Sequence, residues 1–103
     1  MAQKPTITLP WDPVEYLQNE EDMLLYLGAA LEENDPVLVV AVLGDIARAK
    51  GMTQVARDTG MGRESLYKAL SPHGNPEFAT VLKVMQVLGL RFYVESVNES
   101  VAG

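Results

Sequence analysis

The sequence predicts an all-α domain of five or six short helices. Apolar residues recur at intervals of three and four, Asp-Pro pairs mark helix starts, and glycines follow the periodic segments. At 103 residues, 48% hydrophobic and 21% charged, the chain has the proportions of one ordinary domain with one modest core. The sequence contains no Cys, which excludes disulfides, a thiolate nucleophile and a sulfur-ligated metal.

The first segments divide into an arm and two helices. Residues 1–10 hold two prolines and no helical period, so we expect a flexible arm ahead of a single domain over 11–97. A short helix runs to about residue 18, because Asp12 can cap it and Pro13 suits its first position. Asn19 caps the next helix, 20–34, whose apolar residues follow the helical period.

The middle of the chain predicts a long helix and a brief one. Asp35 followed by Pro opens the helix 37–50, which ends at Gly51. Five of its residues are β-branched, so propensity alone would also allow a strand, but the length and the cap favour a helix. Thr53 is expected to cap a helix over 54–59 that ends at Gly60.

The last segments predict two helices and allow a strand. Helices are expected over 63–70 and 77–88, separated by turn residues at 71–76. The segment 90–97 mixes aromatics and Val, which is typical of a short C-terminal edge strand. Such an edge would pair across a two-fold axis, so we expect a homodimer; residues 98–103 are expected to be a disordered tail.

Residues 52–70 have the pattern of a helix-turn-helix. Two short helices that meet at a sharp angle need a small residue at the crossing and a residue that tolerates positive φ in the turn. Ala56 and Gly60 meet these needs. The inner faces would be filled by Val55, Met61, Leu66, Ala69 and Leu70.

The outer face of the second of these helices has the chemistry to contact DNA. An arginine can bond guanine through two donors, a glutamate can accept from cytosine, and tyrosine and lysine can reach phosphate or sugar. The candidate DNA-binding residues are Thr53, Gln54, Arg57, Arg63, Glu64, Ser65, Tyr67 and Lys68. The alternative is a helical hairpin whose outer face is only solvated, with Glu64 and Lys68 as an ordinary i, i+4 ion pair.

The charge is divided along the chain. The total is −6, but residues 1–35 carry eight acids against one lysine, whereas 46–91 carry seven bases against three acids. This division favours two faces with different partners, one anionic and one cationic. The alternative is that the exposed acids only confer solubility.

Three blocks resemble addiction-module antidote proteins, which are HigA-like antitoxins with a Cro/C1-type helix-turn-helix: 43–56 (LGDIARAKGMTQVA), 60–76 (GMGRESLYKALSPHGNP) and 84–90 (VMQVLGL). The likeness covers about 10–91, and Gly62 departs from the broader Cro/C1 pattern. It implies a lambda-repressor-like domain that binds operator DNA, represses its own operon and neutralises a HigB/RelE-like toxin, a small mRNA-cleaving ribonuclease.

The resemblance implies a binding partner for the acidic half of the chain. Toxins of that kind are basic because they bind RNA, so an acidic surface with apolar stripes could cover one. The candidate toxin-binding residues are Trp11, Tyr16, Glu20, Glu21, Asp22, Glu32 and Glu33.

The sequence offers no catalytic set. His73 is the only histidine and lies in a turn, and Ser65 and Ser71 have no identifiable base. We therefore expect no enzyme, metal or cofactor, and a cytoplasmic protein, because the longest apolar stretch, 37–43, is too short to cross a membrane. Two other functions stay open: a stand-alone phage-type Cro-like regulator, and a protein-interaction module whose helix-turn-helix no longer binds DNA.

Overall fold

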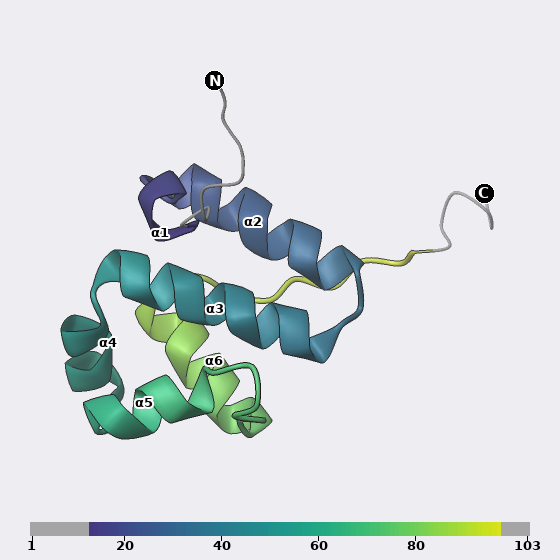
Figure 1. Cartoon of the computed structure of the whole chain (residues 1–103). Coiled ribbons are helices and arrows are strands. Elements are labelled where there is room, and N and C mark those ends of the chain that lie inside the picture. The colour runs from purple at the N-terminus through teal and green to yellow at the C-terminus, as the bar shows by residue number, and fades with distance from the viewer. Residues whose placement is uncertain (1–12, 98–103) are drawn as a thin grey trace, which may run out of the picture.

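The computed structural model describes residues 13–97, which form helices and no strand (Figure 1). None of the described helices is both long and apolar enough to cross a membrane. The predicted all-α fold class is confirmed. The helices are α1 (Pro13–Tyr16), α2 (Glu20–Glu32), α3 (Pro36–Lys50), α4 (Met52–Thr59), α5 (Arg63–Ala69) and α6 (Phe78–Val87).

Side-chain caps start the two longest helices, as predicted. The Asn19 side chain accepts the N–H of Asp22 at 2.8 Å and begins α2. Asp35 Oδ1 accepts the N–H groups of Val37 and Leu38 at 3.1 and 3.4 Å, and Pro36 occupies the first turn of α3. These local bonds select a helix for the β-branched segment after Asp35, because they satisfy amides that a helix start leaves without partners.

Two predictions about secondary structure are wrong. Thr53 does not cap α4, which begins at Met52, two residues before the predicted start: Gly51, at φ 111°, ends α3 and directly precedes α4. Residues 90–97 form no strand, because a strand needs a neighbouring one to pair with, and the described part of this chain provides none. The segment instead runs extended beyond α6 (yellow in Figure 1).

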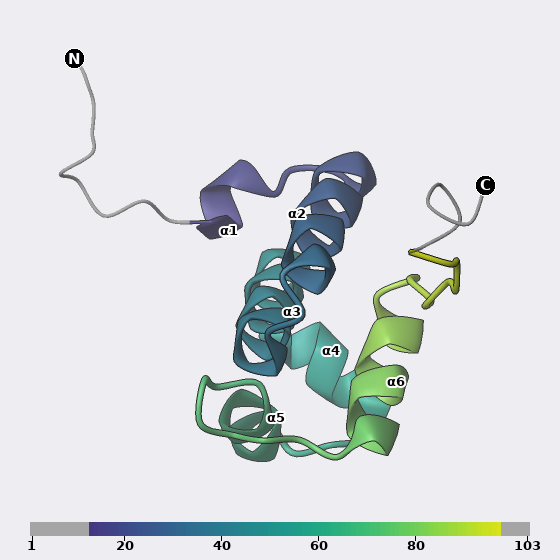
Figure 2. The same ribbon diagram turned by 90° about the vertical axis from the view of Figure 1, so that its right-hand side faces the viewer.

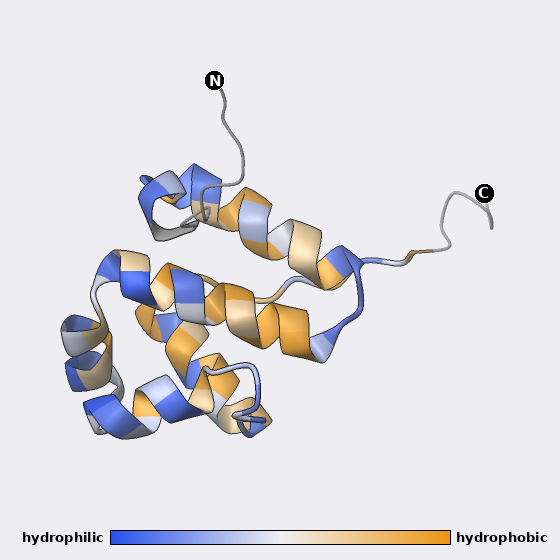
Figure 3. Cartoon of the chain, viewed as in Figure 1, coloured by the Kyte–Doolittle hydropathy of each residue, from blue (hydrophilic) through white to orange (hydrophobic). Residues whose placement is uncertain are grey.

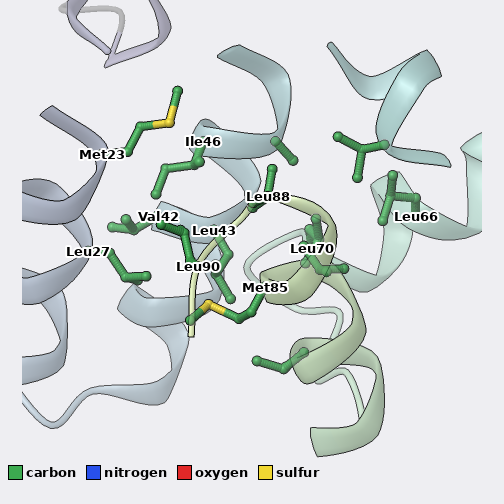
Figure 4. Close-up of a cluster of buried hydrophobic side chains, with 14 of the residues drawn as sticks. Met23, Leu27, Val42, Leu43, Ile46, Leu66, Leu70, Met85, Leu88 and Leu90 are labelled. Atoms are coloured by element: carbon green, nitrogen blue, oxygen red, sulfur yellow. The ribbon is translucent and has the colours of Figure 1, made fainter. Parts of the chain in front are cut away.

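Helix α3 is the centre of the molecule. Both α1 and α2 pack on it, α4 follows it, and α4 in turn packs on α5 and α6. Figures 1 and 2 both place α2 and α5 on opposite sides of α3. Leu43 and Ile46 of α3 are fully buried, as are Leu66 of α5 and Val84 of α6. Figure 4 shows how the side chains of α2, α3, α6 and the segment after α6 meet in one core. The arrangement leaves the outer face of α5 free of packing.

Candidate nucleic-acid interface

A left-handed glycine sets the angle between α4 and α5. Gly60 has φ 77° and ψ 10°, the αL conformation predicted for it. Its N–H donates to the carbonyl of Arg57 at 3.2 Å, and the next N–H, of Met61, donates to the carbonyl of Ala56 at 3.1 Å. This pair of bonds is the Schellman arrangement, which ends a helix and turns the chain away from its axis. These bonds therefore fix the direction in which the chain runs from α4 to α5.

A buried threonine completes this turn, and the sequence analysis missed it. Thr59 is 5% exposed and is the buried polar residue of the described chain. Its Oγ1 donates to the carbonyl of Ala56 at 3.1 Å and accepts the N–H of Met61 at 3.3 Å. The available signal was a hydroxyl residue directly before a helix-ending glycine.

The predicted inner faces of the α4–α5 pair are largely confirmed. Val55, Ala56, Leu66 and Leu70 are buried, while Met61 and the alanine at 69 are half-buried. The buried side chains pack the inner face of α5 against the rest of the domain. The opposite face of α5 is therefore exposed to solvent on a helix whose position is fixed.

Two glycines allow the chain after α5 to pack closely. A Cβ on Gly44 of α3 would lie 2.9 Å from the carbonyl oxygen of Leu70. A Cβ on Gly74 would overlap the carbonyl oxygens of Lys68 and Ala69. The turn at 71–76 therefore folds back against the end of α5, and Ser71 Oγ donates to the carbonyl of Lys68 at 2.8 Å.

The eight candidate DNA-binding residues are all exposed, three on α4 and five on α5. On α4, Arg57 Nη1 donates to Gln54 Oε1 at 3.2 Å, and Gln54 Nε2 donates to Asp58 Oδ1 at 2.9 Å. These two hydrogen bonds orient the side chains of Arg57, Gln54 and Asp58 along α4, and Thr53 takes no part in them. Figure 3 shows both helices largely hydrophilic on the side away from the core.

On α5 the charged side chains do not form ion pairs with each other. The guanidinium carbon of Arg63 lies 5.6 Å from the centre of the Tyr67 ring, one turn away, in cation–π geometry. Glu64 and Lys68 form no ion pair. The one salt bridge among the described residues joins Arg48 and Asp45, at 2.7 Å. The i, i+4 pair of the alternative interpretation is therefore not formed.

The acidic candidates fall into two groups rather than one patch. Glu20 and Glu21 are exposed at the start of α2, and Glu32 and Glu33 are exposed at its end. Glu32 lies eleven positions after Glu21 on this helix, or about 16 Å along the axis. Tyr16 is exposed beside the first group, and Trp11 lies outside the described residues.

Asp22 has a structural task of its own. This half-buried carboxylate accepts the N–H of Gln18 at 3.2 Å, while its own N–H donates to Asn19. The connection between α1 and α2 is therefore held partly by Asp22, which leaves it less available to a partner than its acidic neighbours.

A polar network that the sequence analysis missed joins α2 to α3. The hydroxyl of Tyr26 donates to Asp45 Oδ2 at 2.8 Å, and Arg48 Nη2 donates to Asp45 Oδ1 at 2.7 Å. Burial, together with the hydrogen bond and the negative charge of Asp45, raises the pKa of Tyr26 to about 12. The network therefore ties α2 to α3.

Comparisons with known proteins extend over most of the chain. A family model described as "Probable addiction module antidote protein" matches residues 7–96. A Haemophilus influenzae protein called "Uncharacterized protein" is 54% identical over 85 residues, which is 82% of this chain and 88% of that protein. No solved structure matches the chain. Within the described residues, no cluster of His, Cys, Asp or Glu could hold a metal ion.

Proposed function

The chain belongs to the family of probable addiction module antidote proteins, and from this premise we propose that it is an antitoxin with two activities. It neutralises a small basic HigB/RelE-like ribonuclease, and it binds operator DNA as a Cro/C1-type helix-turn-helix dimer to repress its own operon. The antidote activity is supported by the description of the family. The second is supported by one observation above all, the exposed outer face of α5, on which Glu64 and Lys68 form no ion pair with each other.

The proposed DNA contact uses α5 as a recognition helix. The N-terminal end of such a helix enters the major groove, where Arg63 and Glu64 would meet base edges. Lys68, one turn further along, would contact phosphate. Thr53, Gln54 and Arg57 of α4, together with Ser65 and Tyr67, would contact the backbone on either side.

The acidic charge of the molecule does not prevent this contact. The α2 acids and α5 lie on opposite sides of α3, and packed helix axes are about 8–10 Å apart, so at least two such distances separate them. The resulting distance is about two Debye lengths at physiological salt. Repulsion between these acids and DNA at α5 is therefore largely screened.

The DNA proposal is tested with the promoter region of the chain's own operon. Arg63→Ala should weaken binding to that DNA by about 1–3 kcal/mol and relax sequence preference at one position. Lys68→Ala should weaken binding to every sequence and reduce the slope of log affinity against log salt by about 1. Lys83→Ala is the control, because it removes the same charge from an exposed position on α6.

Two outcomes would contradict the DNA proposal. If the wild-type chain binds its promoter no better than random DNA, the α4–α5 pair is only an interaction module. If Lys83→Ala is as damaging as Arg63→Ala, bulk charge rather than α5 accounts for binding.

The toxin proposal is tested by reversing charge at the two ends of α2 separately. One variant carries Glu20→Lys and Glu21→Lys, and the other carries Glu32→Lys and Glu33→Lys; all four residues are exposed, so the core is unaffected. At least one pair should lower affinity for the co-expressed basic partner about tenfold or more, with less difference at high salt. Unchanged affinity in both variants would show that the acids serve solubility only.

A further inference from the structure

A wide apolar groove lies away from the proposed DNA-binding face and begins beside the acids at the end of α2. It has a volume of about 670 Å³ and runs between the end of α2, the start of α3, the turn at 72–76 and the start of α6. Leu31, Val37, Val40, Phe78 and Phe92 supply apolar walls. The hydropathy colouring of Figure 3 shows that the first half of α3, at this groove, is strongly hydrophobic.

Exposed apolar side chains continue from the groove onto the extended segment beside it. Phe78 is 67% exposed although its ring stacks on Phe92, with ring centres 6.1 Å apart. Next along the chain, Tyr93, Val94 and Val97 are each more than 80% exposed. A hollow and a projecting apolar segment therefore lie side by side, and contiguous apolar surface of this kind marks an interaction site.

The groove has almost no charge, which separates it from the other two faces. No Lys or Arg lines it, and its one carboxylate, Asp35, is engaged as the α3 cap. It therefore suits neither the phosphates of DNA nor a basic toxin, both of which reward opposite charge. A chain of net charge −6 repels its own copies least where the facing surfaces carry little charge, and Glu95 is the one charged residue of the segment 92–97.

We propose that this groove and the segment 92–97 form an interface with a second copy of the chain. In a two-fold interface, residue i of one protomer contacts j of the other and j contacts i, so a hollow and a projection on the same face complement themselves. The projecting Tyr93 and Val94 of each protomer would enter the groove of its partner. The inference rests on the proposed function in one respect, since a two-fold dimer presents two α5 helices to DNA.

The experiment measures the mass of the full chain by sedimentation equilibrium across micromolar concentrations, without DNA or toxin. The wild type should be a dimer. Phe78→Glu and Val94→Glu should each raise the dissociation constant about 100-fold or more, because each variant places two carboxylates, one from each protomer, in an apolar contact. Leu25→Glu is the matched control: Leu25, on α2, is also 67% exposed but lies outside the groove, and its variant should remain a dimer.

Several results would overturn the interface. A monomeric wild type at every concentration would do so, as would a dimer that Leu25→Glu dissociates and Phe78→Glu does not. A Phe78→Glu variant that keeps its mass but no longer binds the basic partner would assign the groove to the toxin. Val94→Glu guards against misfolding, because this side chain is 89% exposed and outside the core. Since mass is measured without DNA, a dimer that fails to bind its promoter would refute the DNA proposal and leave this interface intact.

Discussion

Replacing Gly60 by alanine tests the turn on which the proposed DNA-binding face depends. Gly60 has φ 77°, and a Cβ built on it meets no atom within 4 Å. The substitution therefore causes no clash, and its cost is conformational only. An L-residue in the αL region loses about 1–2 kcal/mol. The restricted unfolded chain returns about 0.4–1 kcal/mol, so we expect a net destabilisation of about 1 kcal/mol.

Replacing a glycine by alanine within a helix should instead stabilise the chain. Gly28 lies inside the helix α2, is exposed, and also has no atom within 4 Å of an added Cβ. Gly28→Ala should stabilise the chain by about 0.5–1 kcal/mol, because glycine is unfavourable within a helix. Gly60→Asn should cost less than Gly60→Ala, because asparagine tolerates the left-handed conformation.

Urea unfolding followed by circular dichroism measures the free energy of unfolding for each variant. A change of 1 kcal/mol corresponds to a shift of about 4–8 °C in Tm for a domain of this size, so thermal unfolding provides a second measure. If Gly60→Ala stabilises the chain as Gly28→Ala does, residue 60 is helical rather than left-handed. Helices α4 and α5 would then be continuous, and α5 could not be presented as a separate recognition helix.

Three further substitutions test other contacts by the same unfolding measurements. Tyr26→Phe should cost about 1–2 kcal/mol, since it removes a half-buried hydrogen bond to a carboxylate. The pKa of Tyr26, about 12, exceeds its ordinary value of 10, so this contribution is complete below pH 10 and lost as the pH rises to about 12; a constant difference between wild type and variant would contradict it. Gly74→Ala should cost about 2–3 kcal/mol or more, because the new Cβ overlaps backbone oxygens of α5; a neutral result would show that the turn is not packed there. Thr59→Val should cost about 1 kcal/mol and Thr59→Ser much less, because serine keeps the hydroxyl; equal losses would assign the effect to packing.

The sequence predicted those parts of the fold that depend on neighbouring residues. Asn19, Asp35 and Gly60 act within a few residues of themselves, so their capping and turning roles can be deduced from spacing alone. The prediction for Thr53 failed because Gly51 serves two helices at once, and that depends on how α3 and α4 pack. The edge strand failed for a related reason: strand propensity does not supply a partner strand.

The candidate site shows the same division. Exposure of Arg63 and Lys68 was predictable, because burying the apolar face of a short helix exposes the opposite face. The contact of Tyr26 with Asp45 spans 19 residues and leaves no local pattern. The acids also looked like one group in the sequence, but the rise of α2 places Glu21 and Glu32 at opposite ends of the helix.

The arrangement around α3 has a consequence for how the proposed partners would affect one another. DNA at α5 and a second copy at the α3–α6 groove would occupy different elements. A basic toxin at the start of α2 would also leave the groove clear, whereas one at Glu32 and Glu33 would border it, because Leu31 lines the groove. A bound basic toxin would offset the net charge of −6, and the complex would then approach DNA with less repulsion than the free chain does. Electrostatics alone therefore predicts that toxin binding strengthens operator binding, most clearly at low salt, where the Debye length approaches the separation between α2 and α5.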